Sequence, residues 1–114
     1  MSSAASSKAK GRKFQQMIRD LIYDKFPSLE EGDVKSTSMG ASGEDIQLSP
    51  AARRKLPYSI ECKARKSLPL YAWYMQARAN APSGAEPLLV VKQDRSKPLV
   101  VVDAEYFFTL IGED

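Results

Sequence analysis

The chain has 114 residues and a net charge of +3, with 43% hydrophobic and 27% charged residues, which is typical of a single globular domain. One cysteine and no histidine exclude an internal disulfide, a Cys/His zinc site, a Ser-His-Asp triad and a histidine general base. No apolar run is long enough to span a bilayer or to form the core of a signal peptide, so we expect a cytoplasmic protein without a membrane partner.

The first part of the chain predicts a tail and a long helix. Residues 1–9 are small and polar and predict a flexible tail, with a single domain over residues 10–114. Apolar residues at helical spacing predict an amphipathic helix over residues 10–26, which Pro27 ends.

The remaining elements are read from alternation, β-branched runs and turn residues. Strands are expected at 34–40, 45–49, 58–64, 87–93 and 98–103, helices at 69–81 and 104–111, and a hairpin connection at 50–57. This order predicts an α/β (α+β) protein with a central mixed β-sheet flanked by helices.

The stretch "YSIECKARK" contains the most informative charges. Glu61 and Lys63 are two residues apart on a strand, so they share one face, while Ile60 and Cys62 point into the core. If the strand at 45–49 pairs with this one, Asp45 meets Glu61, and two neighbouring carboxylates repel unless a cation lies between them. Such oxygens suit Mg²⁺ or Mn²⁺, with the backbone carbonyl of Cys62 as a further ligand.

Lys63 would then orient the attacking water and stabilise negative charge on the phosphate in the transition state. These parts together would hydrolyse a phosphodiester without histidine. A lone ExK motif is weak evidence, and Asp45 on the neighbouring arm strengthens it.

"GEDIQLS" followed by "SIECKAR" resembles the PD-(D/E)xK nuclease superfamily. Asp45, Glu61 and Lys63 match its catalytic residues, although Glu44 stands where a proline is usual. The resemblance implies a restriction-endonuclease-like fold and a Mg²⁺-dependent endodeoxyribonuclease.

Within the superfamily, "AKGRKFQQMIRDL" and "STSMGASGEDI" are most similar to archaeal-type Holliday-junction resolvases and short phage endonucleases. This similarity implies a homodimer that cuts branched or junction DNA in recombination, in a bacterial or phage-infected cell.

One position departs from the family pattern. The glutamate of the first helix is replaced by Gln15 or Gln16, and an amide is a poorer metal ligand than a carboxylate. The site would then hold one metal, or recruit a ligand such as Glu30 or Glu31. Gln76 resembles the glutamine that RecB-like members carry after ExK, and it is equally an exposed helix residue.

Basic residues form clusters that suit a polyanion, although each is also readable as solvated surface. Expected DNA contacts are Arg12, Lys13, Ser38, Arg53, Arg54, Lys55, Arg65 and Lys66, and a further basic set is Lys92, Arg95 and Lys97. Alternative functions are a nuclease or nickase acting on ordinary duplex DNA, a non-catalytic DNA-binding module on the same fold, and a protein-interaction domain.

Overall fold

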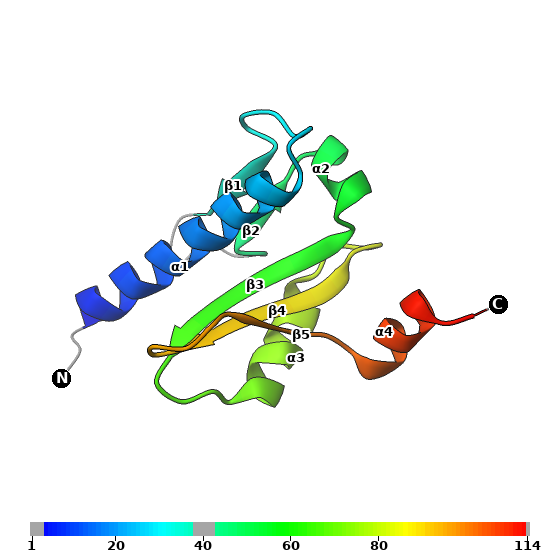
Figure 1. Cartoon of the computed structure of the whole chain (residues 1–114). Helices are drawn as coiled ribbons and strands as arrows, with labels where there is room; N and C mark the ends of the chain where they lie inside the picture. The colour runs from blue at the N-terminus through cyan, green and yellow to red at the C-terminus, as the bar shows by residue number, and fades with distance from the viewer. Residues whose placement is uncertain (1–3, 38–42, 114) are drawn as a thin grey trace.

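The computed structural model describes residues 4–37 and 43–113, which form four helices and one five-stranded sheet. In chain order the elements are α1 (Ala4–Lys25), β1 (Val34–Ser36), β2 (Ile46–Leu48), α2 (Pro50–Lys55), β3 (Tyr58–Arg65), α3 (Leu70–Asn80), β4 (Glu86–Gln93), β5 (Leu99–Val101) and α4 (Ala104–Ile111). The strand order is β1-β2-β3-β4-β5, in which β3 and β4 are parallel and all other neighbours antiparallel. The predicted α+β class, with a mixed sheet flanked by helices, is confirmed (Figure 1).

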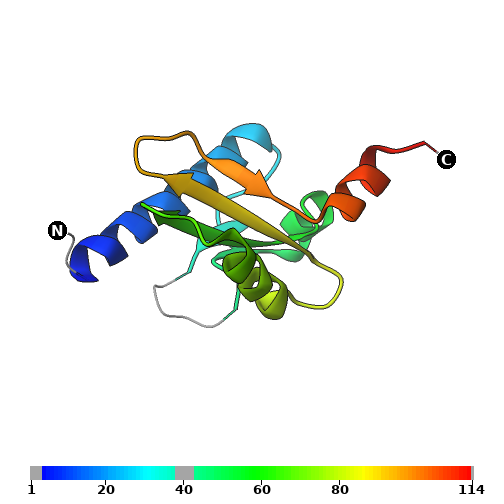
Figure 2. The same ribbon diagram turned by 90° about the horizontal axis from the view of Figure 1, so that it is seen from below.

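Helices α1 and α3 cover opposite faces of the sheet (Figure 2). α1 packs its apolar stripe, which includes Phe14 and Ile18, on Ile60 and Cys62 of β3. α3 lies against β3 and β4 from the other side and buries Ala77 there. β3 is therefore covered on both faces, and the polar face expected from its alternation is not a solvated one.

The first helix begins earlier than its apolar spacing predicts. α1 starts at Ala4, so residues 4–9, which the sequence assigns to a flexible tail, are helical. Alanine and lysine are strong helix formers, and Lys10 is tied to Asp94 by an ion pair of 2.8 Å. The division of the chain into a tail and one domain stays a prediction.

Residues 50–57 connect the antiparallel neighbours β2 and β3, which confirms the predicted hairpin connection, but they are not a simple turn. They contain α2, in which the Ser49 hydroxyl accepts a hydrogen bond from the Ala52 N–H (3.1 Å) and Pro50 occupies the first turn. Serine at the N-cap and proline at the first helical position are strong starting signals. The two prolines that bound the segment, Pro50 and Pro57, are equally typical of a turn. Ala52 of α2 is fully buried.

The other elements agree with the sequence to within a few residues, and residues 38–40 of the predicted first strand lie outside the described residues. The Asp103 side chain caps α4, as expected, by accepting a hydrogen bond from the Tyr106 N–H (2.8 Å). Among the described residues, no helix combines the length and the apolar content that crossing a membrane requires.

Candidate active site

Asp45 lies one residue before β2, and its backbone is hydrogen-bonded to β3 on one side and to the residue after β1 on the other. Its N–H donates to the Ile60 carbonyl (3.0 Å), and its own carbonyl accepts from the Thr37 N–H (2.9 Å) and hydroxyl (3.0 Å). Gly43, with φ of +92°, forms the turn just ahead of it. The Asp45 carboxylate is thereby brought to β3, where its Oδ2 accepts from the Cys62 N–H (2.8 Å).

A second contact holds the approach to Asp45. Arg53 of α2 forms a two-pronged ion pair with Glu44 and donates to the Tyr58 carbonyl at the start of β3. Bidentate arginine–carboxylate pairs fix geometry as well as charge. Arg53 therefore links α2, the segment before β2 and β3, and a DNA phosphate would have to displace this pair to reach it.

Glu61 and Lys63 share the face of β3 that α3 covers. The distance from Glu61 Oε1 to Lys63 Nζ is 3.9 Å, and their side chains are only 5% and 18% exposed. The side chain of Asn80, at the end of α3, lies beside the Glu61 carboxylate and lowers its pKa. Asp45, Glu61 and Lys63, the predicted catalytic residues, are therefore brought together, with Lys63 the more accessible end of the pair.

Burial raises the pKa of both carboxyl groups, and the charge of Asp45 adds to the shift of Glu61. Burial and the negative charge of Asp45 together raise the pKa of Glu61 to about 7, although Lys63 and Asn80 oppose the shift. The pKa of Asp45 is also raised, mainly by burial, although the hydrogen bond from the Cys62 N–H and the charge of Lys63 lower it. A cation between the two groups would relieve both causes at once.

The donors around this point suit a hard divalent cation. In a strand the N–H and C=O of one residue point to the same edge, so the Cys62 carbonyl is directed, like its N–H, toward Asp45. Two carboxylates and a carbonyl oxygen are ligands that Mg²⁺ and Mn²⁺ accept, with water and substrate oxygens completing the shell. The described part of the chain contains no cluster of three or more His, Cys, Asp or Glu side chains able to hold a metal.

The Cys62 thiol points away from these groups into the core under α1. Burial raises its pKa well above the ordinary range, and the charges of Asp45 and Glu61 add to this shift. A thiol in this environment is a core group and not a nucleophile.

The three glutamines of the predicted auxiliary site have different surroundings. Gln15 is buried and accepts a hydrogen bond from the Ser36 hydroxyl (2.8 Å). The next residue, Thr37, donates hydrogen bonds to the Asp45 carbonyl. Gln16 is half-buried and Gln76 is exposed on α3. Gln15 is therefore the one that the structure ties to the neighbourhood of Asp45.

Glu30 and Glu31, considered as replacement ligands, are exposed in the loop before β1. They precede Val34, which pairs with Leu48 at the end of the β1–β2 ladder away from Asp45. Their position does not favour a role as ligands beside Glu61.

Most of the expected DNA-contacting residues are exposed. They are Arg12, Lys13, Arg54, Lys55, Arg65 and Lys66, whereas Arg53 is engaged as described above. Ser38 lies outside the described residues.

Sequence reasoning missed two side chains beside the predicted trio. Asn80 is separated from Glu61 by a whole helix, and an asparagine at a helix end carries no sign of such a contact. Ser59 is buried on the same face, and its hydroxyl has no hydrogen-bond partner among the described residues. Strand alternation does indicate the face of Ser59, but not its burial.

Comparison of the chain with protein-family models, with curated proteins and with solved structures gives no match.

Proposed function

We propose that the chain is a Mg²⁺- or Mn²⁺-dependent DNA endonuclease of the PD-(D/E)xK type, with a restriction-endonuclease-like fold. The observation that carries the proposal is that two carboxylates with raised pKa, Asp45 at the edge of β3 and Glu61 on it, come together near Lys63. Perturbed carboxylates held together with an amine are typical of catalytic sites.

In this proposal Asp45, Glu61 and the Cys62 carbonyl hold the cation, which when bound supplies a Lewis acid for the phosphate and lowers the pKa of water. Lys63 orients the attacking water and stabilises the negative charge that develops on the phosphate oxygens. The water loses a proton to solvent and forms the new bond to phosphorus, and the leaving strand oxygen takes up a proton. The Cys62 N–H fixes the Asp45 carboxylate in position, and Asn80 lies beside that of Glu61.

The test is nicking of a supercoiled plasmid with Mg²⁺ or with EDTA. We expect cleavage by the wild type only with the metal, and loss of cleavage in Asp45→Asn and Lys63→Ala. Asp24→Asn, which removes an exposed carboxylate on α1, is the matched control and should cleave normally. If all four proteins behave alike with and without metal, the proposal is wrong and a DNA-binding module is favoured.

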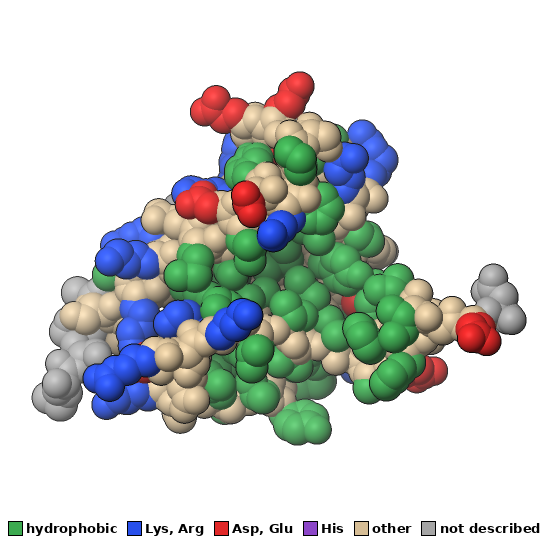
Figure 3. All heavy atoms as spheres, viewed as in Figure 1, with side chains coloured by type: hydrophobic (Ala, Val, Ile, Leu, Met, Phe, Trp, Pro, Cys, Tyr) green, Lys and Arg blue, Asp and Glu red, His purple; other side chains and the backbone are tan. Residues whose placement is uncertain are grey.

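We propose further that the endonuclease is a homodimer that acts on branched DNA. Two symmetric cuts need two sites, and each chain offers one. Support for a dimer comes from an apolar surface on β5 and α4, which we call the α4 surface (Figure 3). It consists of Leu99, Val100, Phe107, Phe108, Leu110 and Ile111.

The α4 surface needs a partner because α4 is apolar and short. Phe108 is 66% exposed, no residue of α4 is buried, and the helix stands at the opposite end of the molecule from the start of α1 (Figure 1). Helices of this length are marginal in water without tertiary packing. A second copy presenting the same surface would cover it on the scale of about 800 Å² per partner that specific interfaces bury.

Light scattering tests the dimer. The wild type should have twice the 12.6 kDa mass of the chain, and Phe108→Glu should be monomeric. Leu21→Glu adds the same charge at an exposed leucine of α1 and should remain dimeric. A monomeric wild type would contradict the dimer, and equal cleavage of a four-way junction and of a linear duplex with the same arms would contradict the branched substrate.

A further inference from the structure

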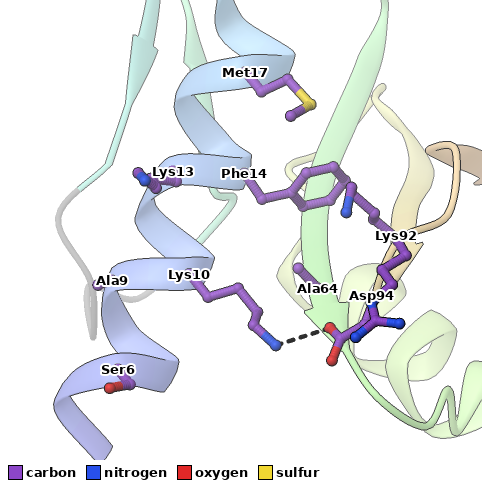
Figure 4. A pocket seen from close by; sticks show the side chains of 10 residues that line it. Ser6, Ala9, Lys10, Lys13, Phe14, Met17, Ala64, Lys92 and Asp94 are labelled. Atoms are coloured by element: carbon purple, nitrogen blue, oxygen red, sulfur yellow. Dashed lines mark hydrogen bonds and ion pairs between the residues drawn. The ribbon is translucent and has the colours of Figure 1, made fainter. Parts of the chain in front are cut away.

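A groove of about 680 Å³ lies between the first half of α1 and the ends of β3 and β4. Its walls carry Lys10 and Lys13 from α1, and Lys92 and Arg95 from β4 and the turn that follows it. Figure 4 shows Lys10 reaching across the groove to Asp94 and Phe14 pointing into it from α1. The tertiary structure therefore joins two basic sets that are about eighty residues apart in the sequence.

Cations predominate in this groove. Asp94 is its only acidic lining residue among those described, and its pKa is lowered by the hydrogen bond from Lys10 and by the charges of Lys10, Lys66 and Lys92. One carboxylate thus faces several ammonium groups, so the groove keeps an excess of positive charge. Figure 3 shows Lys and Arg side chains gathered at this end of the molecule.

The tight turn that joins the antiparallel strands β4 and β5 places Arg95 at the groove. Arg95 has φ of +60°, and it is the one non-glycine residue with positive φ in the described part of the chain. The turn is closed by a hydrogen bond from the Ser96 N–H to the Gln93 carbonyl (3.0 Å). A non-glycine residue in this conformation costs on the order of 1 kcal/mol, and such strain concentrates at functional sites.

We propose that this groove binds the phosphate backbone of one strand of the DNA substrate. The proposal rests on the proposed function. Ala64 of β3 lines the groove on the face of the strand that α1 covers, whereas Glu61, three residues earlier, lies on the face that α3 covers, so a bound DNA strand would pass around the edge of β3 between the groove and the site.

Fluorescence anisotropy of a labelled DNA strand in EDTA tests the groove without requiring cleavage. The triple variant Lys10→Ala/Lys92→Ala/Arg95→Gly should bind on the order of tenfold or more weakly, with a salt slope smaller by about 2. Lys35→Ala, at an exposed lysine of β1, is the control for a single charge, and each single groove variant should exceed its effect.

Two further variants separate binding from folding. Arg95→Gly suits the positive φ, so it should keep or raise the thermal midpoint while it weakens DNA binding. Asp94→Asn removes the groove's acid and should tighten binding, whereas a merely structural Lys10–Asp94 pair would leave affinity unchanged.

The groove proposal is wrong if the groove variants bind DNA like Lys35→Ala, or if inorganic polyphosphate binds and a DNA strand does not. Because these measurements exclude metal and cleavage, they stand even if the plasmid test of the proposed nuclease fails. Conversely, normal binding by the groove variants of an active nuclease would overturn the groove alone.

Discussion

The two faces of β3 differ in chemistry although a helix covers each. Toward α1 the strand presents Ile60 and Cys62, which pack into the main apolar core. Toward α3 it presents Ser59, Glu61 and Lys63. Ser59 and Glu61 are about as buried as Ile60 and Cys62. Burying a carboxylate costs free energy, whereas burying an aliphatic side chain stabilises the fold. The difference teaches that one strand can contribute stability on one face and retain reactive groups on the other.

The largest expected effect contrasts neighbouring residues of β3. Ile60→Ala should lower the free energy of unfolding by about 2–5 kcal/mol, because it leaves a cavity in the core. Glu61→Gln should leave stability at pH 8 unchanged or raise it, while slowing cleavage by about 10²–10³-fold. Urea unfolding and plasmid cleavage measure the two quantities. Equal destabilisation by both substitutions would remove the distinction between the faces.

The pH dependence of stability sharpens the comparison. Glu61 has a folded-state pKa of about 7 against an ordinary value of 4.5, so between these values the folded state holds a proton that the unfolded state has lost. In EDTA the free energy of unfolding should therefore fall by about 3 kcal/mol as pH rises through this window, and level off above it. Glu61→Gln should flatten the curve. Superimposable curves for the two proteins would contradict the shifted pKa.

A metal ion bound by Asp45 and Glu61 should stabilise the folded protein. With Mg²⁺ at about 100 times its dissociation constant, the free energy of unfolding should rise by about 2.7 kcal/mol. Asp45→Asn should abolish this rise and Asp24→Asn should retain it, as measured by unfolding with and without EDTA. A rise that persists in Asp45→Asn would place the metal elsewhere.

The smallest expected effect compares two serines. Ser59→Ala removes a buried hydroxyl that has no partner among the described residues, so it should raise the free energy of unfolding by up to about 1 kcal/mol. Ser36→Ala removes the hydrogen bond to buried Gln15 and should lower it by about 1 kcal/mol. Destabilisation by Ser59→Ala would mean that its hydroxyl is bonded in solution.

Local patterns allowed much of the site to be anticipated. Side chains alternate along any strand, so Glu61 and Lys63 had to share a face opposite Ile60 and Cys62. The Asp103 cap of α4 was equally predictable, because a capping side chain bonds the backbone three residues ahead. Ser49 and Pro50 signal the start of α2 in the same local way, through an N-cap hydroxyl and a proline in the first turn.

The sequence by itself determined which side chains point together along one strand, because backbone geometry sets that period. Only the tertiary structure decided that Asp45 bonds the Cys62 N–H, that Asn80 reaches Glu61, and that Lys10 meets Asp94. These contacts depend on strand pairing and on how helices pack across the sheet. One order of helices and strands along a chain permits several such arrangements, and the free energy of the whole core selects one of them.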